Sequence, residues 1–261
     1  MDHISDILDK YDGYFLDVWG VLYHEGVGVI PSAREGLRLL QEHQKKVLLV
    51  SNASRPGKDL AAFLDGKGIS RASYQHIVTS GDCTHAYFRQ YTKPVRCFAS
   101  GYFRNQAIFE GVPVTLVSSP EEAEIFVPCV PEQDAPTLDP FLPLLDRCLA
   151  AKLPMICANC DEYVLVKGER VVRTGLFARY YEEKGGKVAA FGKPHACIYE
   201  YAHTFVPDIP KSRLCMVGDG LKTDILGANN FGIDSLWISS GVSAGDKDTG
   251  ITPTYQMPVF G

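Results

Sequence analysis

Short apolar segments alternate with helical patterns in the first eighty residues, and this alternation limits the fold more than any other feature. The expected strands are residues 13–18 and 46–50, and the expected helices are residues 32–44 and 59–64. Ser32, followed three residues later by Glu35, predicts a capping box at the first helix. Strands that are apolar throughout are buried on both faces, as in a parallel sheet covered by helices. The sequence therefore predicts an α/β fold.

The same alternation returns near the C-terminus, and a different segment separates the two halves. The C-terminal strands are expected at residues 189–191, 214–217 and 235–238, with helices at residues 195–203 and 223–231. Residues 92–186 have their own strand-like runs and a loop-rich stretch with five prolines between positions 128 and 143. We therefore predict a discontinuous core domain of residues 1–80 and 187–261, interrupted by an inserted domain of residues 81–186.

Charge and hydropathy exclude several classes of protein. The 26 Lys and Arg against 31 Asp and Glu give a net charge of −5, which argues against binding nucleic acid by neutralising phosphates. No stretch approaches the roughly 18 apolar residues of a membrane helix, and no basic n-region of a signal peptide is visible at the N-terminus. We expect a cytoplasmic protein with reduced cysteines. Cys157 and Cys160 form a lone C-x-x-C, for which ordinary thiols are favoured over a metal or redox site.

Polar residues that suit phosphate chemistry follow several of the predicted strands. In parallel sheets, active sites gather beyond the carboxyl ends of the strands. Those positions hold Asp17, Ser51, Asn52, Asp219 and Asp224, and Lys193 stands at the start of a helix. The acids suit a divalent cation such as Mg²⁺, and the hydroxyl and ammonium groups suit a phosphoryl group. Acids at strand ends are also ordinary helix caps, so this pattern alone leaves both interpretations open.

Four segments together resemble the motifs of the haloacid dehalogenase (HAD) superfamily. They occur in the superfamily's order as residues 17–22 (DVWGVL), 50–54 (VSNAS), 191–194 (FGKP) and 217–224 (VGDGLKTD). The long insert and residues 155–161 (MICANCD) resemble the class IIA branch, which includes NagD-type phosphatases. The resemblance implies a Rossmannoid parallel-sheet core with an inserted α/β cap domain. It also implies Mg²⁺ as cofactor and a small phosphorylated metabolite as substrate.

The resemblance assigns a role to each matching residue. Asp17 is expected to attack phosphorus and form an aspartyl-phosphate, with Ser51 and Lys193 stabilising charge. The expected metal ligands are Asp17, the backbone carbonyl of Trp19, Asp219 and Asp224. The expected phosphate- and substrate-binding residues are Gly20, Asn52, Asn159 and Asp161.

The chain departs from the phosphatase pattern at Trp19, where the family carries an acid that protonates the leaving group. Tryptophan has no titratable group near neutral pH, and general acid–base help is worth about 10²–10⁴-fold. His24 and Glu25 could replace the acid, although solvated loop residues are the favoured interpretation. Two hypotheses follow: a Mg²⁺-dependent phosphohydrolase or phosphotransferase that is weak on unactivated esters, or an impaired module that binds a phosphorylated ligand or a protein.

Three arginines and a strand edge bear on substrate contacts and on oligomeric state. Arg55, Arg104 and Arg179 could contact an anionic substrate, although scattered arginines usually face solvent. A strand edge in the inserted domain could pair with a second copy, so a homo-oligomer is possible. The sequence does not identify the substrate.

Overall fold

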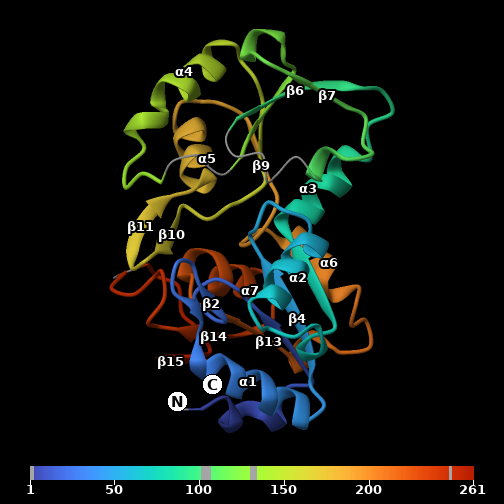
Figure 1. The fold of residues 1–261 in the computed structure, drawn as a ribbon, viewed down its shortest axis with the longest axis vertical. Coiled ribbons are helices and arrows are strands. Elements are labelled where there is room, and N and C mark those ends of the chain that lie inside the picture. Colours follow the sequence, from blue (N-terminus) through green and yellow to red (C-terminus); the bar gives the residue numbers. More distant parts are fainter. Residues whose placement is uncertain (1–2, 101–106, 130–133, 247–248) are drawn as a thin grey trace.

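Six parallel strands form one of two large sheets in the computed structural model, which describes residues 3–100, 107–129, 134–246 and 249–261. Their order is β15-β14-β13-β1-β4-β5, and we call this the core sheet. The strands are β1 (Gly13–Leu16), β4 (Lys46–Ser51), β5 (His76–Thr79), β13 (Leu214–Gly218), β14 (Asp234–Ile238) and β15 (Tyr255–Met257). The core sheet occupies the lower half of Figure 1, where the two termini also lie.

Helices cover both faces of the core sheet because successive strand residues point to opposite sides. In β1, Tyr14 and Leu16 pack in one cluster with residues of α1 and α2, whereas Phe15 packs in a second cluster with residues of α6 and α7. The helices around this sheet are α1 (Pro31–Glu42), α2 (Gly57–Gly66), α3 (Ser80–Phe88), α6 (Ala196–His203) and α7 (Leu226–Phe231). This two-sided burial is why β1 and the middle of β4 are apolar without alternation.

A second parallel sheet, the cap sheet, has five strands in the order β12-β9-β8-β6-β7. Its strands are β6 (Val95–Ser100), β7 (Val114–Val117), β8 (Ile125–Pro128), β9 (Met155–Cys157) and β12 (Val188–Ala190). Helices α4 (Leu142–Ala150) and α5 (Thr174–Glu183) pack with it in one cluster. These elements form the upper half of Figure 1. The predicted α/β fold with a parallel-sheet core and an inserted α/β unit is confirmed.

Two small hairpins bring the halves together. The first is β2 (Tyr23–His24) with β3 (Gly28–Val29), and the second is β10 (Tyr163–Val166) with β11 (Glu169–Val172). A bridge joins Glu25 to Val166, and the Lys167 backbone N–H donates to the Glu25 carbonyl at 3.2 Å. Arg170 contacts a second core segment, the loop after β14, where it donates to the Val242 carbonyl at 2.5 Å. The β10–β11 hairpin therefore spans the junction of the two halves (Figure 1).

Three local predictions differ from the structure. Strand β12, which we expected in a core resuming at residue 187, pairs with β9 in the cap sheet, so we propose that the core resumes after Ala190. Helix α1 starts without a capping box, because it begins at Pro31, a favoured first helical residue, so that Ser32 lies inside the helix and the N-cap is Ile30, which has no side-chain oxygen. The helix expected over residues 223–231 is divided in the structure. Its first residues belong to a π-helical turn, Leu221–Ile225, and the α-helix α7 begins at Leu226.

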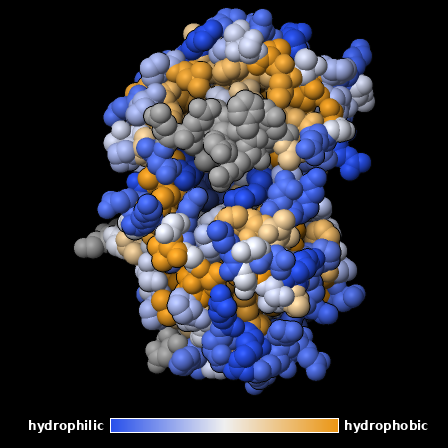
Figure 2. Space-filling model, viewed as in Figure 1, coloured by the Kyte–Doolittle hydropathy of each residue, from blue (hydrophilic) through white to orange (hydrophobic). Residues whose placement is uncertain are grey.

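The surface is polar where the two halves meet. Figure 2 shows a waist between the upper and lower parts, with hydrophilic side chains over much of its described surface. Among the described residues, no helix combines the length and apolarity needed to cross a membrane.

Candidate active site

Three aspartates meet at the carboxyl edge of the core sheet. Leu16 in β1 is level with Val217 in β13, so the residues that follow these two strands emerge side by side. Asp17 follows β1, Asp219 follows β13, and Asp224 lies in the π-helical turn. One carboxylate oxygen from each lies within 4.8 Å of the others, and all three residues are buried. The three carboxylates thus face one small volume.

Lys193 neutralises part of this charge. Its Nζ lies 2.7 Å from Asp17 Oδ1 and 2.7 Å from Asp224 Oδ1, and it donates to the Val50 carbonyl at 2.8 Å. The residue is only 1% exposed. The nearby charges of Asp17 and Asp224 raise the pKa of the Lys193 ammonium, although its burial acts in the opposite direction. It therefore stays charged at neutral pH.

The aspartates carry more negative charge than Lys193 can balance. Burial raises the pKa of Asp17 to about 7 against the lowering effect of Lys193, and Asp224 adds to the rise. Burial, followed by the charges of Asp17 and Asp224, also raises the pKa of Asp219. Asp224 Oδ1 forms an ion pair with Lys193 Nζ at 2.7 Å, but the angles of this contact do not make it a hydrogen bond. A hard divalent cation with oxygen ligands fits this donor set.

Gly20 leaves room for one of these carboxylates. Its φ of +83° lies in the left-handed region, and an added Cβ would stand 2.0 Å from Asp219 Oδ2. That oxygen accepts a hydrogen bond from the Val242 backbone N–H at 2.7 Å. Glycine at position 20 therefore meets both a backbone and a packing requirement.

Ser51 and Asn52, at the end of β4, lie beside the lysine. Ser51 is fully buried, and its Oγ accepts a hydrogen bond from the Ala53 N–H at 3.2 Å, which leaves its own O–H available as a donor. The Asn52 side chain accepts from the Lys193 N–H at 2.7 Å and donates to the Lys193 carbonyl at 2.9 Å. These two bonds fix the orientation of the amide, since a flipped amide would lose both.

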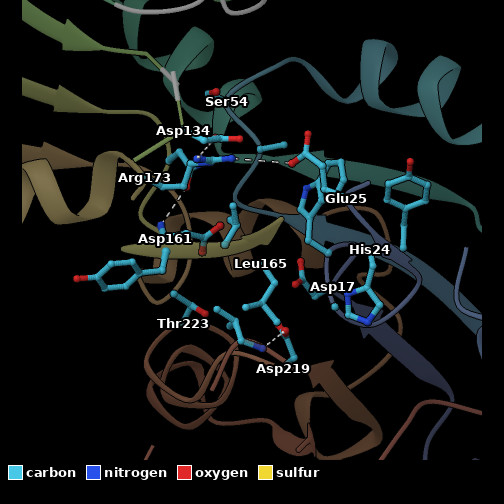
Figure 3. Close-up of a pocket in the computed structure, with 18 of the residues that line it drawn as sticks. Asp17, His24, Glu25, Ser54, Asp134, Asp161, Leu165, Arg173, Asp219 and Thr223 are labelled. Atoms are coloured by element: carbon cyan, nitrogen blue, oxygen red, sulfur yellow. Dashed lines mark hydrogen bonds and ion pairs between the residues drawn. The ribbon is translucent and has the colours of Figure 1, made fainter. Parts of the chain in front are cut away.

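A cavity of about 300 Å³ opens over the aspartates, between the core and the cap side. Six of the predicted site residues line it: Asp17, Trp19, Gly20, Asn159, Asp161 and Asp219. Ser51, Asn52, Lys193 and Asp224 are not among the lining residues that the structure describes. The contacts above join Asn52, Lys193 and Asp224 to the group, and Ser51 follows Val50, whose carbonyl accepts from Lys193. Figure 3 shows Asp17 and Asp219 on the core side, facing Asp161 and Arg173 from the cap side.

The loop after β9 places Asp161 against the core. Asp161 Oδ1 accepts a hydrogen bond from Asn52 Nδ2 at 2.8 Å. The Asn159 side chain turns back and accepts from the Asp161 N–H at 2.9 Å. The two predicted cap residues therefore belong to one turn, and Asp161 connects the cap side to the second motif of the core.

Three further charged residues in the cavity were missed as a group by the sequence analysis. Arg173, only 6% exposed, lies 3.2 Å from Asp134 and 3.9 Å from Glu25. Figure 3 shows Arg173 between these two carboxylates. The three residues come from separate segments, so no motif signals their meeting. His24 and Glu25, for which solvated loop residues were the favoured interpretation, both line the cavity, and the Glu25 side chain remains 46% exposed.

Trp19 packs against the core. Its ring lies 5.5 Å from that of Tyr23 and 5.8 Å from that of Phe63. The Arg55 guanidinium lies 4.8 Å from the Phe63 ring, and Arg55 lines the cavity. One edge of the cavity is therefore an aromatic cluster with an arginine above it.

The remaining candidates lie elsewhere. Arg179 is paired with Glu162 at 3.0 Å and does not line this cavity, and Arg104 lies outside the described residues. Cys157 and Cys160 are free thiols, and Cys157 Sγ donates to the Asn159 carbonyl at 3.1 Å. Cys157 thus helps to hold the cap loop.

Comparisons with known proteins agree with this arrangement. Family models described as haloacid dehalogenase-like hydrolase and HAD-hydrolase-like match residues 14–113 and 190–260. The crystal structure of a haloacid dehalogenase-like hydrolase from Brucella suis is 34% identical, with a TM-score of 0.92 and 100% of both chains covered.

Two other relatives span nearly the whole chain. The 5'-nucleotidase YutF of Bacillus subtilis is 28% identical, over 90% of each chain. The structure of a possible sugar phosphatase of the HAD superfamily from Cytophaga hutchinsonii is 25% identical, with a TM-score of 0.83 and coverage of 99% of this chain and 97% of that one. From the motifs, the fold and these relatives, we conclude that the chain belongs to the haloacid dehalogenase-like hydrolases.

Proposed function

We propose that this enzyme is a Mg²⁺-dependent phosphohydrolase that acts on a small phosphorylated metabolite through an aspartyl-phosphate. The observation that carries the proposal is the group of three buried aspartates, two of them paired with Lys193 and two of them, Asp17 and Asp219, lining the cavity. The names of two relatives, a 5'-nucleotidase and a possible sugar phosphatase, support a phosphorylated substrate.

Asp17 is the proposed nucleophile. One of its oxygens attacks phosphorus while the bond from phosphorus to the leaving oxygen breaks. Lys193, at 2.7 Å from Asp17 Oδ1, favours the ionised carboxylate against the effect of burial and balances charge on the phosphoryl group. Ser51, whose O–H remains free to donate, would hold a phosphoryl oxygen. Water then hydrolyses the aspartyl-phosphate and restores Asp17.

Asp17, Asp219 and Asp224 would hold the metal ion, together with the backbone carbonyl of Trp19. When bound, Mg²⁺ supplies positive charge that offsets the aspartates and polarises the phosphoryl group. The phosphate-binding roles of Gly20 and Asn52 belong to the same proposal. Asn52 would also position Lys193, because its side chain accepts from the Lys193 N–H and donates to the Lys193 carbonyl.

The rest of the cavity accommodates the leaving group. Its walls include Tyr163, Val164 and Leu165 of the β10–β11 hairpin, and Arg173 with its two carboxylate partners. A volume of about 300 Å³ suits a small metabolite. The hairpin's side chains would therefore select the substrate.

The test is hydrolysis of 4-nitrophenyl phosphate by the purified chain, with Mg²⁺ and with EDTA. We expect metal-dependent turnover that Asp17→Asn abolishes while the variant keeps its folded circular-dichroism spectrum. Turnover that persists in EDTA or in Asp17→Asn would contradict the scheme.

The alternative of an impaired binding module rests on Trp19 alone. The relatives named as a nucleotidase and a possible phosphatase favour an active enzyme instead. An inactive wild-type chain that still binds Mg²⁺ and inorganic phosphate in calorimetry would revive the binding module.

A further inference from the structure

Trp19 leaves the proposed reaction without a residue to protonate the leaving group, and the cavity contains few candidates. A suitable group must face the cavity, be able to hold a proton and not be needed elsewhere. Apart from Asp17 and Asp219, the described carboxyl groups that line the cavity are Glu25, Asp134 and Asp161.

Glu25 and Asp134 are poor candidates. Both flank Arg173, at 3.9 and 3.2 Å, and a guanidinium remains charged throughout the neutral range. Each carboxylate is already engaged by the buried Arg173 guanidinium, so neither is free to serve the leaving group. His24 is no better as an acid, because burial lowers its pKa and leaves the imidazole neutral.

Asp161 differs from these groups in its hydrogen bonds. Its Oδ1 accepts from Asn52 Nδ2, and the other Asn52 contacts fix that nitrogen as the donor. Oδ1 is therefore an acceptor, and a proton on this carboxyl would sit on Oδ2. Burial raises the pKa of Asp161 and outweighs the lowering effects of Lys193 and of the Asn52 hydrogen bond, so the buried setting favours a proton on this carboxyl.

The loop that carries Asp161 is held from several directions. Thr174 Oγ1 and Cys157 Sγ donate to the Asn159 carbonyl at 2.8 and 3.1 Å, and the Gly175 N–H donates to the Asp161 carbonyl at 2.9 Å. An added Cβ on Gly175 would stand 2.6 Å from that carbonyl carbon and oxygen. Such anchoring gives the fixed geometry that proton transfer needs.

We propose that Asp161, supplied from the cap side, is the general acid and base that replaces the missing acid at position 19. In the first step, Asp17 attacks phosphorus and the Asp161 proton passes to the leaving oxygen, so an alcohol departs. In the second step, the Asp161 carboxylate takes a proton from water. The resulting hydroxide attacks phosphorus, the bond to Asp17 breaks, and inorganic phosphate leaves. This inference rests on the proposed function, since it assumes the aspartyl-phosphate.

The test compares two esters of similar size, 4-nitrophenyl phosphate and benzyl phosphate, in Asp161→Asn. Asparagine keeps an oxygen to accept the Asn52 hydrogen bond but has no proton to transfer. We expect kcat/KM for benzyl phosphate to fall about 10²–10⁴-fold. Because nitrophenolate leaves without protonation, its kcat/KM should fall less than about tenfold. Slow hydrolysis of the phosphoenzyme should then give a burst of nitrophenolate.

Three controls separate the outcomes. Glu162→Gln removes the neighbouring carboxyl, which pairs with Arg179. It should leave kcat/KM for both esters within about twofold of the wild-type values. Trp19→Asp in the Asp161→Asn background should raise kcat/KM for benzyl phosphate at least about tenfold, because it returns an acid to the position where the family carries one. Wild-type turnover that depends on Asp17 tests the proposed function independently of Asp161.

An equal loss on both esters would overturn the proposal, since it would indicate that Asp161 only orients substrate or Asn52. Unchanged benzyl phosphate hydrolysis in Asp161→Asn would overturn it as well. The ester comparison does not depend on Trp19→Asp, so the proposal can fail even if that variant does not fold.

Discussion

The side chain of Asn52 holds Lys193 by both its backbone N–H and its carbonyl, at 2.7 and 2.9 Å, while the same amide donates to Asp161 at 2.8 Å. One core residue thereby positions the cationic group of the site and the acid that the cap side contributes. Asn52 is 1% exposed, so these bonds lie away from bulk water.

We expect Asn52→Ala to destabilise the chain, because the Lys193 amide and carbonyl would lose partners in a buried setting. The cost should be about 2–4 kcal/mol, measured by urea unfolding. Asn229→Ala is the matched control, since the side chain of exposed Asn229 donates a hydrogen bond to the Thr252 carbonyl. Its cost should stay below about 1 kcal/mol. Equal costs for the two variants would mean that Asn52 does not organise the site.

The residues predicted at the base of the site come together in the structure, whereas the charged group around Arg173 was not predicted. Asp17, Asp219 and Lys193 stand next to apolar strands in recognisable motifs, and the parallel register brings the strand ends to one edge. Arg173, Glu25 and Asp134 meet only because the β10–β11 hairpin reaches the core. No local pattern encodes such a meeting, since none of the three is near another in the chain.

Sheet membership also depends on contacts between distant segments of the chain. The apolar character of Val188–Ala190 predicts a strand but does not say which sheet takes it, and β12 pairs with β9. The two-residue strands of the β2–β3 hairpin are too short to show a period. Sequence patterns thus predicted elements, whereas sheet membership depends on partners far along the chain.

Lys193→Met should destabilise the metal-free chain strongly. Methionine fills a similar volume but leaves Asp17 and Asp224 buried without their shared cation. Losing one partner of a buried ion pair costs about 3–5 kcal/mol, which chemical unfolding at pH 8 in EDTA would show. Lys222→Met, at an exposed position of the neighbouring π-helical turn, should change stability by less than about 0.5 kcal/mol. If the two variants unfold alike, the Lys193 pairs contribute little.

The metal-free chain should lose stability as pH rises from about 4 to 7. Burial raises the pKa of Asp17 to about 7 and also raises that of Asp219, so the native state binds protons that the unfolded state has released. Each such proton changes the free energy of unfolding by up to about 1.4 kcal/mol per pH unit. Mg²⁺ should remove this loss by balancing the ionised carboxylates.

Thermal melts between pH 5 and pH 8, in EDTA and in Mg²⁺, would measure the effect. The gain in melting temperature from Mg²⁺ should grow with pH over this range. A gain that is the same at both ends, or larger at pH 5, would show that the three aspartates are not the metal site.

Gly20→Ala should abolish metal binding while the chain still folds. The added Cβ would stand 2.0 Å from Asp219 Oδ2, so that carboxylate must move, and the φ of +83° adds backbone strain of about 1–2 kcal/mol. Gly232→Ala isolates the strain, because Gly232 has a φ of +81° with nothing within 4 Å of the new Cβ. Both variants should melt lower than the wild type, but only Gly20→Ala should lose the stabilisation by Mg²⁺. Retention of that stabilisation in Gly20→Ala would show that Asp219 can move without loss of the ion, and that the close packing of Gly20 is not what positions this ligand.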